Sequence, residues 1–356
     1  MSEFESLLHR PRPSAWDLFR RRPCIFLAEK LYSHHRRLRP LNTPPSLSSP
    51  TGSAAAAAIV RRSFRLSGED KEDEDEENSV SIVCISDTHN ANTRCDPLPD
   101  GDVLIHAGDL TQGGSLAELQ AAVAWLRAQP HRHKIVVAGN HDLLLDPDCD
   151  YNHPHPKLVG DDVDGRARRR RQRDEERARI DWGDIHYLCD SSVSITLEGE
   201  KRRLKVYGSP RSPRNGNWAF QYPRENGGAV WDRKVPDDAD ILVTHGPPKG
   251  HLDLEGHLGC EHLLRKVWRV RSALRLHVFG HVHEGHGHEW VPFDALQQAY
   301  EQTVLEGGGV WNLCKVAWAF AASLFRVSEA RCQMVNAAMV GGLRDEVRRR
   351  PIKVYI

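Results

Sequence analysis

Five short apolar segments of this 356-residue chain each end in a small group of polar residues. The segments are rich in Val, Ile, Leu and Phe, which is typical of strands that are buried on both faces. The polar group that follows each segment combines Gly or Thr with Asp, Asn or His. In chain order, the groups are Asp87-Thr88-His89, Gly108-Asp109, Gly139-Asn140-His141-Asp142, Thr244-His245-Gly246 and Gly280-His281-Val282-His283.

This repeated order predicts an α/β fold with polar loops at the carboxyl ends of buried strands. Residues 115–127 predict a helix, because Ser115 and Glu118 form a capping box in front of an apolar face. Residues 193–197 and 204–207 predict a hairpin. We expect residues 335–339 and 353–356 to close a second sheet. The other predicted strands are residues 80–85, 103–107, 134–138, 241–244 and 276–279.

The polar groups have the composition of a metal site. Ligands of α/β proteins bind beyond the carboxyl ends of the strands, where loops converge on a rigid sheet. Asp87 and His89 are two residues apart, so an extended chain would direct both to the same side, and the same holds for His281 and His283. Glycine beside a ligand lets the backbone approach a metal ion. Mixed Asp, Asn and His ligands favour Mn, Fe or Zn, and Mg also fits.

Taken together, the motifs D-x-H, G-D, G-N-H-D, T-H-G and G-H-x-H resemble those of the calcineurin-like metallophosphoesterase superfamily. The stretches Thr244–Asp253 and Val340–Arg344 are similar to one branch, the metallophosphoesterase-domain proteins with brain-expressed animal members and fungal relatives. The resemblance covers roughly residues 80–356. It implies a metallophosphoesterase-type α/β sandwich of two mixed sheets flanked by helices.

The resemblance also implies a role for each motif residue around two divalent metal ions. His141 would face the substrate and stabilise or protonate the leaving oxygen, and Asp142 would orient His141 through a hydrogen bond. A hydroxide between the ions would attack phosphorus. The implied metal ligands are Asp87, His89 and His283 for the first ion, Asn140, His245 and His281 for the second, and Asp109 as the bridge between them.

Two further sets of residues are candidates for substrate contacts. The aromatic residues of 217–222 alternate, so on an extended segment they would share one face and either stack a nucleobase or cover the sheet. The resemblance implies a phosphodiesterase for a small or nucleotide-like substrate, including a cyclic nucleotide. A phosphomonoesterase or a protein phosphatase is the alternative. The candidates are Trp218, Phe220 and Tyr222 for the base, and Arg211, Arg214 and His251 for the phosphate.

The rest of the chain divides into a leader and two insertions. Residues 1–79 predict a disordered or partly helical leader, because they include a Pro- and Ser-rich stretch and an acidic block at 69–77. Residues 80–356 form the predicted domain, with insertions near 152–182 and 288–331. Residues 16–38 predict a basic amphipathic helix that lies on an anionic membrane or packs on its own domain. Residues 310–325 predict a very apolar helix, for which self-packing is favoured over membrane or partner contact.

Composition limits the function classes. The chain has 49 basic and 49 acidic residues, and this lack of a basic excess argues against a specific nucleic-acid partner. Its eight cysteines form no C-x-x-C pair, and no secretory signal is visible, so we expect a cytoplasmic protein with reduced thiols, with peripheral membrane contact as an option. A membrane-associated, non-catalytic binding protein is the alternative of a different class. Retention of His141 and His281 argues against it. The sequence does not indicate an oligomeric state.

Overall fold

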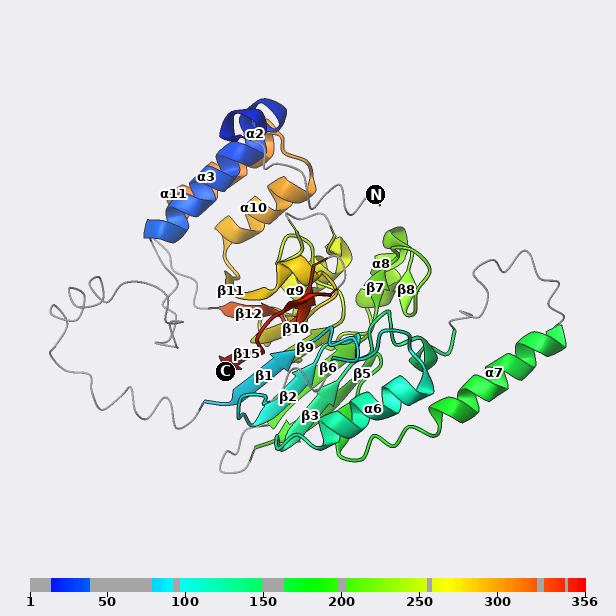
Figure 1. The fold of residues 1–356 in the computed structure, drawn as a ribbon. Coiled ribbons are helices and arrows are strands. Elements are labelled where there is room, and N and C mark those ends of the chain that lie inside the picture. The colour runs from blue at the N-terminus through cyan, green and yellow to red at the C-terminus, as the bar shows by residue number, and fades with distance from the viewer. Residues whose placement is uncertain are drawn as a thin grey trace, which may run out of the picture.

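Two large sheets pack face to face, and helices cover their outer faces (Figure 1). This arrangement confirms the predicted α/β sandwich of two mixed sheets. The computed structural model of the protein describes residues 14–38, 79–91, 97–148, 163–197, 203–254, 258–324, 330–342 and 345–356. The predicted acidic block at 69–77 and most of the leader lie outside these residues.

The first sheet has the strand order β15-β1-β2-β3-β4. Strands β1 to β4 are parallel, and β15 pairs with β1 in the antiparallel sense. The expectation that residues 353–356 close the second sheet is therefore wrong, because they form the edge of the first one. The strands are β1 (Ser81–Ile85), β2 (Val103–His106), β3 (His133–Val136), β4 (Ile185–Tyr187) and β15 (Ile352–Tyr355).

The second sheet has the order β11-β12-β10-β9-β6-β5. Its inner strands are parallel, whereas β5 and β6 form the predicted antiparallel hairpin. Two short ribbons, β7–β8 (Ser212–Pro213 and Gln221–Tyr222) and β13–β14 (Val340–Gly341 and Val347–Arg348), lie outside it. The strands are β5 (Ser191–Thr196), β6 (Arg203–Ser209), β9 (Ile241–Thr244), β10 (Leu276–Phe279), β11 (Gly287–Pro292) and β12 (Arg331–Asn336).

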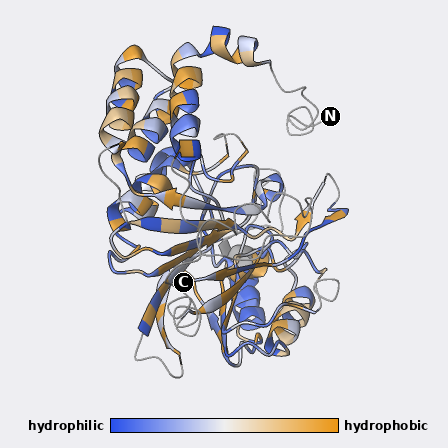
Figure 2. Ribbon diagram, turned by 90° about the vertical axis from the view of Figure 1, so that its left-hand side faces the viewer, coloured by the Kyte–Doolittle hydropathy of each residue, from blue (hydrophilic) through white to orange (hydrophobic). Residues whose placement is uncertain are grey.

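Alternating side chains of the strands fill separate cores on the two faces of each sheet. In β1, Ile82 and Cys84 enter the core between the sheets, whereas Val83 and Ile85 pack under helix α6 (Leu116–Arg127). On the far side, helices α8 (Gly227–Trp231) and α9 (Glu261–Val270) cover the second sheet. Figure 2 shows hydrophobic residues concentrated in these central strands. Burial on both faces explains why the strands are continuous apolar runs.

The helices confirm several local predictions. Ser115 caps α6 and forms the expected capping box with Glu118. The charged insertion forms helix α7 (Val163–Arg177), and its N-terminal flank lies outside the described residues. Arg173 and Arg177 of α7 donate hydrogen bonds to carbonyl oxygens of the 3-10 helix η2 (Leu143–Leu145) and of the residue after it, so α7 braces the loop that follows β3.

The leader and the second insertion form a joint helical unit, which consists of α2 (Ala15–Arg21), α3 (Pro23–Leu38), α10 (Ala295–Leu305) and α11 (Val310–Ser323). It lies beyond β11 and β12, at the top of Figure 1. Ala28 of α3 packs with Leu296, Val316 and Ala319 in a small core of its own. The structure thus favours self-packing for both helical segments, although each also leaves hydrophobic side chains exposed.

Candidate metal centre

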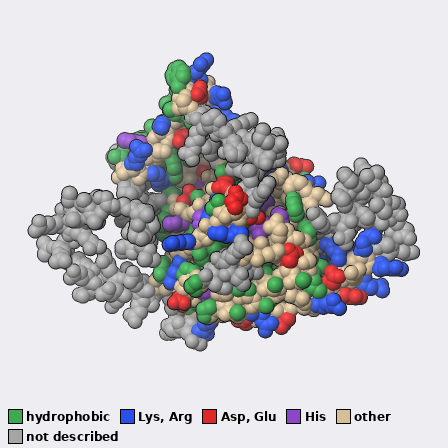
Figure 3. All heavy atoms as spheres, in the orientation of Figure 1, with side chains coloured by type: hydrophobic (Ala, Val, Ile, Leu, Met, Phe, Trp, Pro, Cys, Tyr) green, Lys and Arg blue, Asp and Glu red, His purple; other side chains and the backbone are tan. Residues whose placement is uncertain are grey.

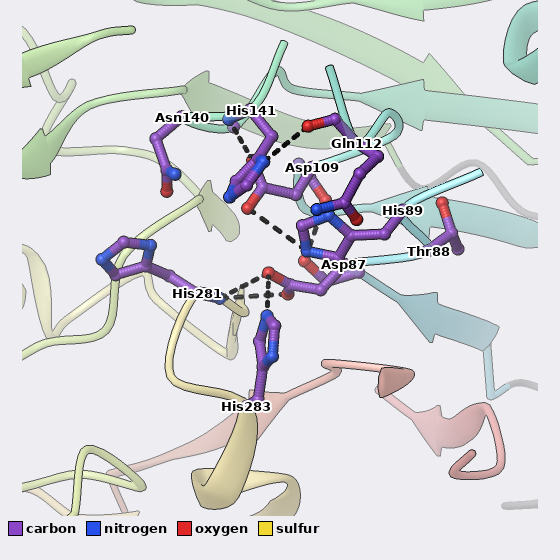
Figure 4. Close-up of polar contacts among 12 residues, drawn as sticks. Asp87, Thr88, His89, Asp109, Gln112, Asn140, His141, His281 and His283 are labelled. Atoms are coloured by element: carbon purple, nitrogen blue, oxygen red, sulfur yellow. Dashed lines mark hydrogen bonds and ion pairs between the residues drawn. The ribbon is translucent and has the colours of Figure 1, made fainter. Parts of the chain in front are cut away.

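The five polar groups meet where the carboxyl ends of β1, β2 and β3 from the first sheet face those of β9 and β10 from the second. Figure 4 shows the side chains of Asp87, His89, Asp109 and His283 pointing toward one another, whereas that of Thr88 points away. In Figure 3, histidine and acidic side chains reach the surface near the middle of the visible face. Strand ends from both sheets therefore build a single polar site, as the sequence predicted.

Three of the predicted ligands form a first group. The ligand atoms of Asp87, His89 and His283 all lie within 4.8 Å of one another. The Nε2 atom of His283 is 3.3 Å from Asp87 Oδ1, and its Nδ1 atom is 3.5 Å from Asp345 Oδ1. Asp345 therefore holds the His283 ring from the side away from Asp87, which is the usual role of a carboxylate behind a histidine ligand.

A second group contains Asp109, His245 and His281, whose ligand atoms also lie within 4.8 Å of one another. The Nε2 atom of His245 is 2.9 Å from Asn140 Oδ1 and 3.2 Å from His281 Nδ1. The other ring nitrogen of His245 contacts the backbone oxygen of Ala107 at 3.0 Å. That contact fixes the ring so that Nε2 faces the centre.

Asp109 connects the two groups. Its Oδ2 atom is 3.7 Å from His89 Nε2 and 3.4 Å from His245 Nε2. Its Oδ1 atom accepts a hydrogen bond of 2.7 Å from the backbone nitrogen of His141. One buried carboxylate thus faces histidines of both groups, which is the position that a bridging ligand requires.

The backbone of the site is turned, not extended. Asp87, His89, Asp109 and His281 all have positive φ values, between 44° and 67°. Such conformations are uncommon for residues other than glycine, and they cluster at functional sites. The predicted extended backbone at Asp87 and His89 is therefore wrong, although the two side chains do converge. Their left-handed turns direct both side chains into the centre.

Two glycines allow the loops to approach the carboxylates. A Cβ atom at Gly139 would lie 2.2 Å from Asp109 Oδ1, and one at Gly280 would lie 2.1 Å from Asp87 Oδ2. Any side chain at either position would displace a carboxylate of the centre. These contacts confirm the prediction that glycine is needed beside the ligands.

The arrangement fits divalent metal ions. Both ring nitrogens of His89 are buried and have no hydrogen-bond partner within the described part of the chain. A buried imidazole without a partner is costly, and a metal ion would satisfy it. The remaining donors are carboxylate, imidazole and amide groups, which suit Mn, Fe, Zn or Mg better than soft metals.

The charges of the centre influence one another strongly. Burial alone would raise the pKa of Asp109, but the neighbouring His245 and His89 hold it well below its usual range. Burial alone would lower the pKa of His245, but the carboxylates of Asp109 and Asp87 raise it to about 9. For His281, burial and the nearby His245 together lower the pKa to about 3. The Asp109 carboxylate is therefore ionised, which is the form that binds a cation.

His141 lies at the edge of the centre, where its Nδ1 atom is 2.8 Å from the backbone oxygen of Gln112. Its ring stacks on Trp218 with centroids 4.2 Å apart. This differs from the prediction that Asp142 orients His141. The Asp142 carboxylate is fully buried and accepts hydrogen bonds from the backbone nitrogens of Leu110 and Gly139, and from other donors. Asp142 therefore ties the loops after β2 and β3 together, and the Gln112 carbonyl positions His141.

The aromatic triplet does not share a face. Phe220 is 1% exposed and packs in the core under α6, whereas Tyr222 is 4% exposed and packs under α9. The φ value of Phe220 is +58°, so the chain turns there and the alternation of an extended segment is lost. Of the two alternatives for Phe220 and Tyr222, packing in the core holds and stacking on a nucleobase is wrong. Of the three aromatic residues, Trp218 lies beside the centre.

Two of the three residues predicted to contact phosphate are instead paired with carboxylates of the protein. Arg211 is ion-paired with Asp190 at 3.2 Å, and Arg214 is exposed next to the β7–β8 ribbon. His251 is 3% exposed and contacts Glu289 at 2.9 Å and Glu301 at 3.1 Å. A buried histidine between two carboxylates is not available to a phosphate, so that prediction for His251 is corrected.

The sequence analysis missed two contributors to the site, the Gln112 carbonyl and the Asp345 carboxylate. A backbone carbonyl gives no residue-type signal, so Gln112 was not detectable from sequence. Asp345 directly follows the Val340–Arg344 stretch that resembles the family, and this neighbourhood was its only signal. Leu343 and Arg344 lie outside the described residues.

Comparison with known proteins agrees with this geometry. Residues 80–285, more than half of the chain, match the family model described as Calcineurin-like phosphoesterase. The chain is 39% identical over 216 residues to the human Metallophosphoesterase domain-containing protein 1, covering 58% of this chain and 61% of that protein. It is 37% identical over 222 residues to a UPF0046 protein of Caenorhabditis elegans, covering 59% of this chain and 71% of that protein.

A longer fungal protein is also similar. The chain is 44% identical over 283 residues to a protein of Emericella nidulans named Probable rhamnogalacturonate lyase C. The alignment covers 79% of this chain but 25% of that protein. The chain thus spans a quarter of the fungal relative and less than two thirds of the human one.

The sandwich, the converging ligands and the family match together define a metallophosphoesterase domain. The chain belongs to the calcineurin-like phosphoesterase family. Within that family, the similarity to the human and Caenorhabditis elegans proteins supports the branch of metallophosphoesterase-domain-containing and UPF0046 proteins that the sequence motifs indicated.

Proposed function

We propose that this protein is a dinuclear-metal-dependent phosphodiesterase that hydrolyses a small or nucleotide-like phosphate diester. The observation that carries the proposal is the position of Asp109, whose Oδ2 atom faces His89 of one ligand group and His245 of the other. A carboxylate shared by two groups supports two ions side by side. A purely structural metal site would be closed by a single set of four ligands.

In this proposal, one ion would be held by Asp87, His89 and His283. The other would be held by Asn140, His245 and His281, with Asp109 between the two. When bound, the ions would polarise the phosphate and activate water as the nucleophile. The Asp87 carboxylate is also fixed by the backbone nitrogen of His281, which donates to its two oxygens at 3.0 and 3.2 Å.

His141 is the proposed general acid for the leaving oxygen. When its Nδ1 atom donates to the Gln112 carbonyl, its Nε2 atom is left free to carry and release a proton. The stacked Trp218 ring restricts the imidazole to this orientation. The backbone nitrogen of Ala219 donates to the Asn140 carbonyl at 3.1 Å, so the Trp218 segment is fixed to the ligand loop itself.

The substrate class is proposed from the family branch and from Trp218, which is the one residue of the predicted aromatic triplet beside the centre. An aromatic ring next to the leaving-group side suits a flat, nucleotide-like substrate, including a cyclic nucleotide. A phosphomonoesterase or a protein phosphatase is the alternative. The lyase activity in the name of the Emericella nidulans protein is not proposed, because this chain covers a quarter of that protein.

The direct experiment compares hydrolysis of bis-p-nitrophenyl phosphate and p-nitrophenyl phosphate by the purified full chain with added Mn²⁺. We expect preferential cleavage of the diester. Asn140→Ala removes a proposed ligand and should abolish the activity. His288→Ala is the matched control, because His288 is an exposed histidine of β11 that is not among the proposed ligands.

Preferential cleavage of the monoester would replace the diester proposal with the phosphomonoesterase alternative. Equal activity of Asn140→Ala and the unmodified chain would show that the cleavage does not arise at this centre. A cytoplasmic location and contact with a membrane through residues 16–38 or 310–325 are separate predictions. They concern the helical unit and not the metal centre.

A further inference from the structure

The helical unit lies outside the residues of the family match and carries most of the large exposed hydrophobic side chains of the described surface. Eight of the nine such residues belong to it or directly follow it, and the ninth is Val347. Scattered single residues would need no explanation, whereas a concentration on one small unit indicates an interaction surface. The eight are Trp16, Leu18, Leu27, Leu38, Val310, Trp311, Trp318 and Leu324.

The outer face of α11 is entirely apolar. Its buried positions are Asn312, Val316 and Ala319, which face α3 and α10. A surface helix normally carries polar residues on the opposite side. On α11, Trp311 is 75% exposed and Trp318 is 79% exposed, seven residues apart and therefore on the same face. The exposed positions of the helix are Val310, Trp311, Cys314, Ala317, Trp318, Ala321 and Ala322.

Basic side chains accompany this face. Residues 15–38 contain six Lys and Arg against two acidic residues, a net charge of +4 (6 − 2), in a chain whose total is zero. Arg20 and Arg21 in the last turn of α2 and Arg22 directly after it are exposed, close in sequence to the exposed Trp16. Figure 3 shows hydrophobic and basic side chains together at the tip of the unit.

The basic and apolar helices are neighbours along their length. A Cβ atom on Gly308 would lie 3.5 Å from Ile25 Cγ1, so α11 begins beside the first turn of α3. At the other end, the rings of His35 and Phe320 are 5.8 Å apart. The two helices therefore run side by side in the same direction at one end of the molecule (Figure 1).

We propose that the helical unit is a docking surface for an anionic lipid bilayer. Exposed tryptophans would enter the interfacial region, where an apolar ring and a polar N–H are both accommodated. The arginines would be attracted to anionic headgroups. The helices would lie in the plane of the interface, since none of the helices that the structure describes is both long and apolar enough to cross a bilayer. This inference does not depend on the proposed enzymatic activity.

The test is flotation of the full chain with vesicles of phosphatidylcholine, with and without phosphatidylserine. We expect the chain to float with the vesicles that contain phosphatidylserine, and the double variant Trp311→Ser/Trp318→Ser to bind at least about tenfold less. Arg20→Gln/Arg21→Gln/Arg22→Gln should weaken binding by about tenfold or more, and only on anionic vesicles. Both sets of residues are exposed, so the fold should persist, and unchanged circular dichroism would verify that.

Two variants serve as matched controls. Val347→Ser removes an exposed hydrophobic residue of β14, and Arg168→Gln/Arg170→Gln/Arg171→Gln removes three exposed arginines of α7. Neither should change flotation. Failure of the full chain to float with anionic vesicles would overturn the proposal. So would equal flotation of the tryptophan variant and the unmodified chain, or an equal loss in the α7 control, which would indicate attraction without a specific surface.

Discussion

The sandwich and the helical unit differ in which side chains they bury and which they expose. The sandwich buries its apolar side chains in three cores and gathers a largely buried polar centre at its strand ends. The helical unit buries a core of only four small or aliphatic residues and exposes its tryptophans. Polar contacts, such as those from Tyr32 to Gln297 and from Arg36 to Asp294, also hold its helices together. The candidate metal centre and the exposed apolar surface thus lie in different regions of the chain.

The two regions also differ in how they are assembled. Each motif of the sandwich directly follows its own strand, so local sequence places the ligands. The helical unit joins segments that are far apart, since Tyr32 and Gln297 are separated by 265 residues. His251, Glu289 and Glu301 connect the regions, because Glu301 belongs to α10 and His251 to the loop after β9. Apart from this contact each region has a core of its own, and we expect substitutions in the two cores to act separately.

The largest expected effect is that of Asp109→Asn. The substitution retains shape but removes the charge that faces both ligand groups. We expect kcat/KM for the diester to fall by about ten thousandfold or more. Lipid flotation should be unchanged. Measurable loss of flotation in this variant would show that the sandwich and the helical unit are not independent.

His141→Ala should lower kcat by about a hundredfold to a thousandfold, because the proposed proton donor is lost while the ligands remain. Metal content, measured by mass spectrometry of the purified protein, should be the same as in the unmodified chain. Trp218→Ala should lower kcat less, by about tenfold, because this substitution only loosens the His141 ring that Trp218 stacks on. Loss of metal in His141→Ala would mean that this residue is a ligand.

Two matched core substitutions compare the regions directly. Leu204 lies between the sheets and Leu296 lies in the helical unit, and both are fully buried. Each change to Ala should cost about 2–4 kcal/mol. In hydrogen-exchange mass spectrometry, Leu204→Ala should weaken protection across the strands, and Leu296→Ala only in α3, α10 and α11. Equal loss of protection in β1 and β2 in both variants would contradict two separable regions.

The last expected effect concerns pH, and it is the smallest when taken per pH unit. Burial alone would lower the pKa of His251, but Glu289 and Glu301 raise it to about 10. A raised pKa means that the stabilising contribution is complete below the unfolded value of about 6.5 and is lost as pH rises toward 10. Protection of α10 should therefore fall by up to about 1.4 kcal/mol per pH unit above neutrality. His251→Asn should flatten this dependence, and an unaltered slope in the variant would exclude the triad as its origin.

Much of the sandwich was predictable because its strands are buried on both faces and are followed by groups that combine Gly or Thr with Asp, Asn or His. The errors have identifiable physical causes. The edge strand β15 could not be assigned to a sheet, since an antiparallel edge strand carries no signal of its neighbour. The alternation of Trp218, Phe220 and Tyr222 failed because the positive φ of Phe220 turns the chain.

The contacts that were missed join distant residues or use the backbone. Asp142 and His141 are adjacent, yet Asp142 bonds to backbone donors of the β2 loop and His141 to the Gln112 carbonyl. His251 is neutralised by carboxylates 38 and 50 residues away. The packing of α3 on α10 and α11 likewise depends on a meeting of segments that no local pattern specifies.

The proposed dinuclear centre depends on Asp109, whose carboxylate faces both ligand groups. The most direct test measures Mn²⁺ bound per chain after loading and removal of excess ion, for the unmodified protein and for Asp109→Asn. If the dinuclear proposal holds, we expect two ions per chain in the unmodified protein, and fewer in the variant together with loss of diester hydrolysis. A single ion in the unmodified protein, or the same metal content in both, would contradict it.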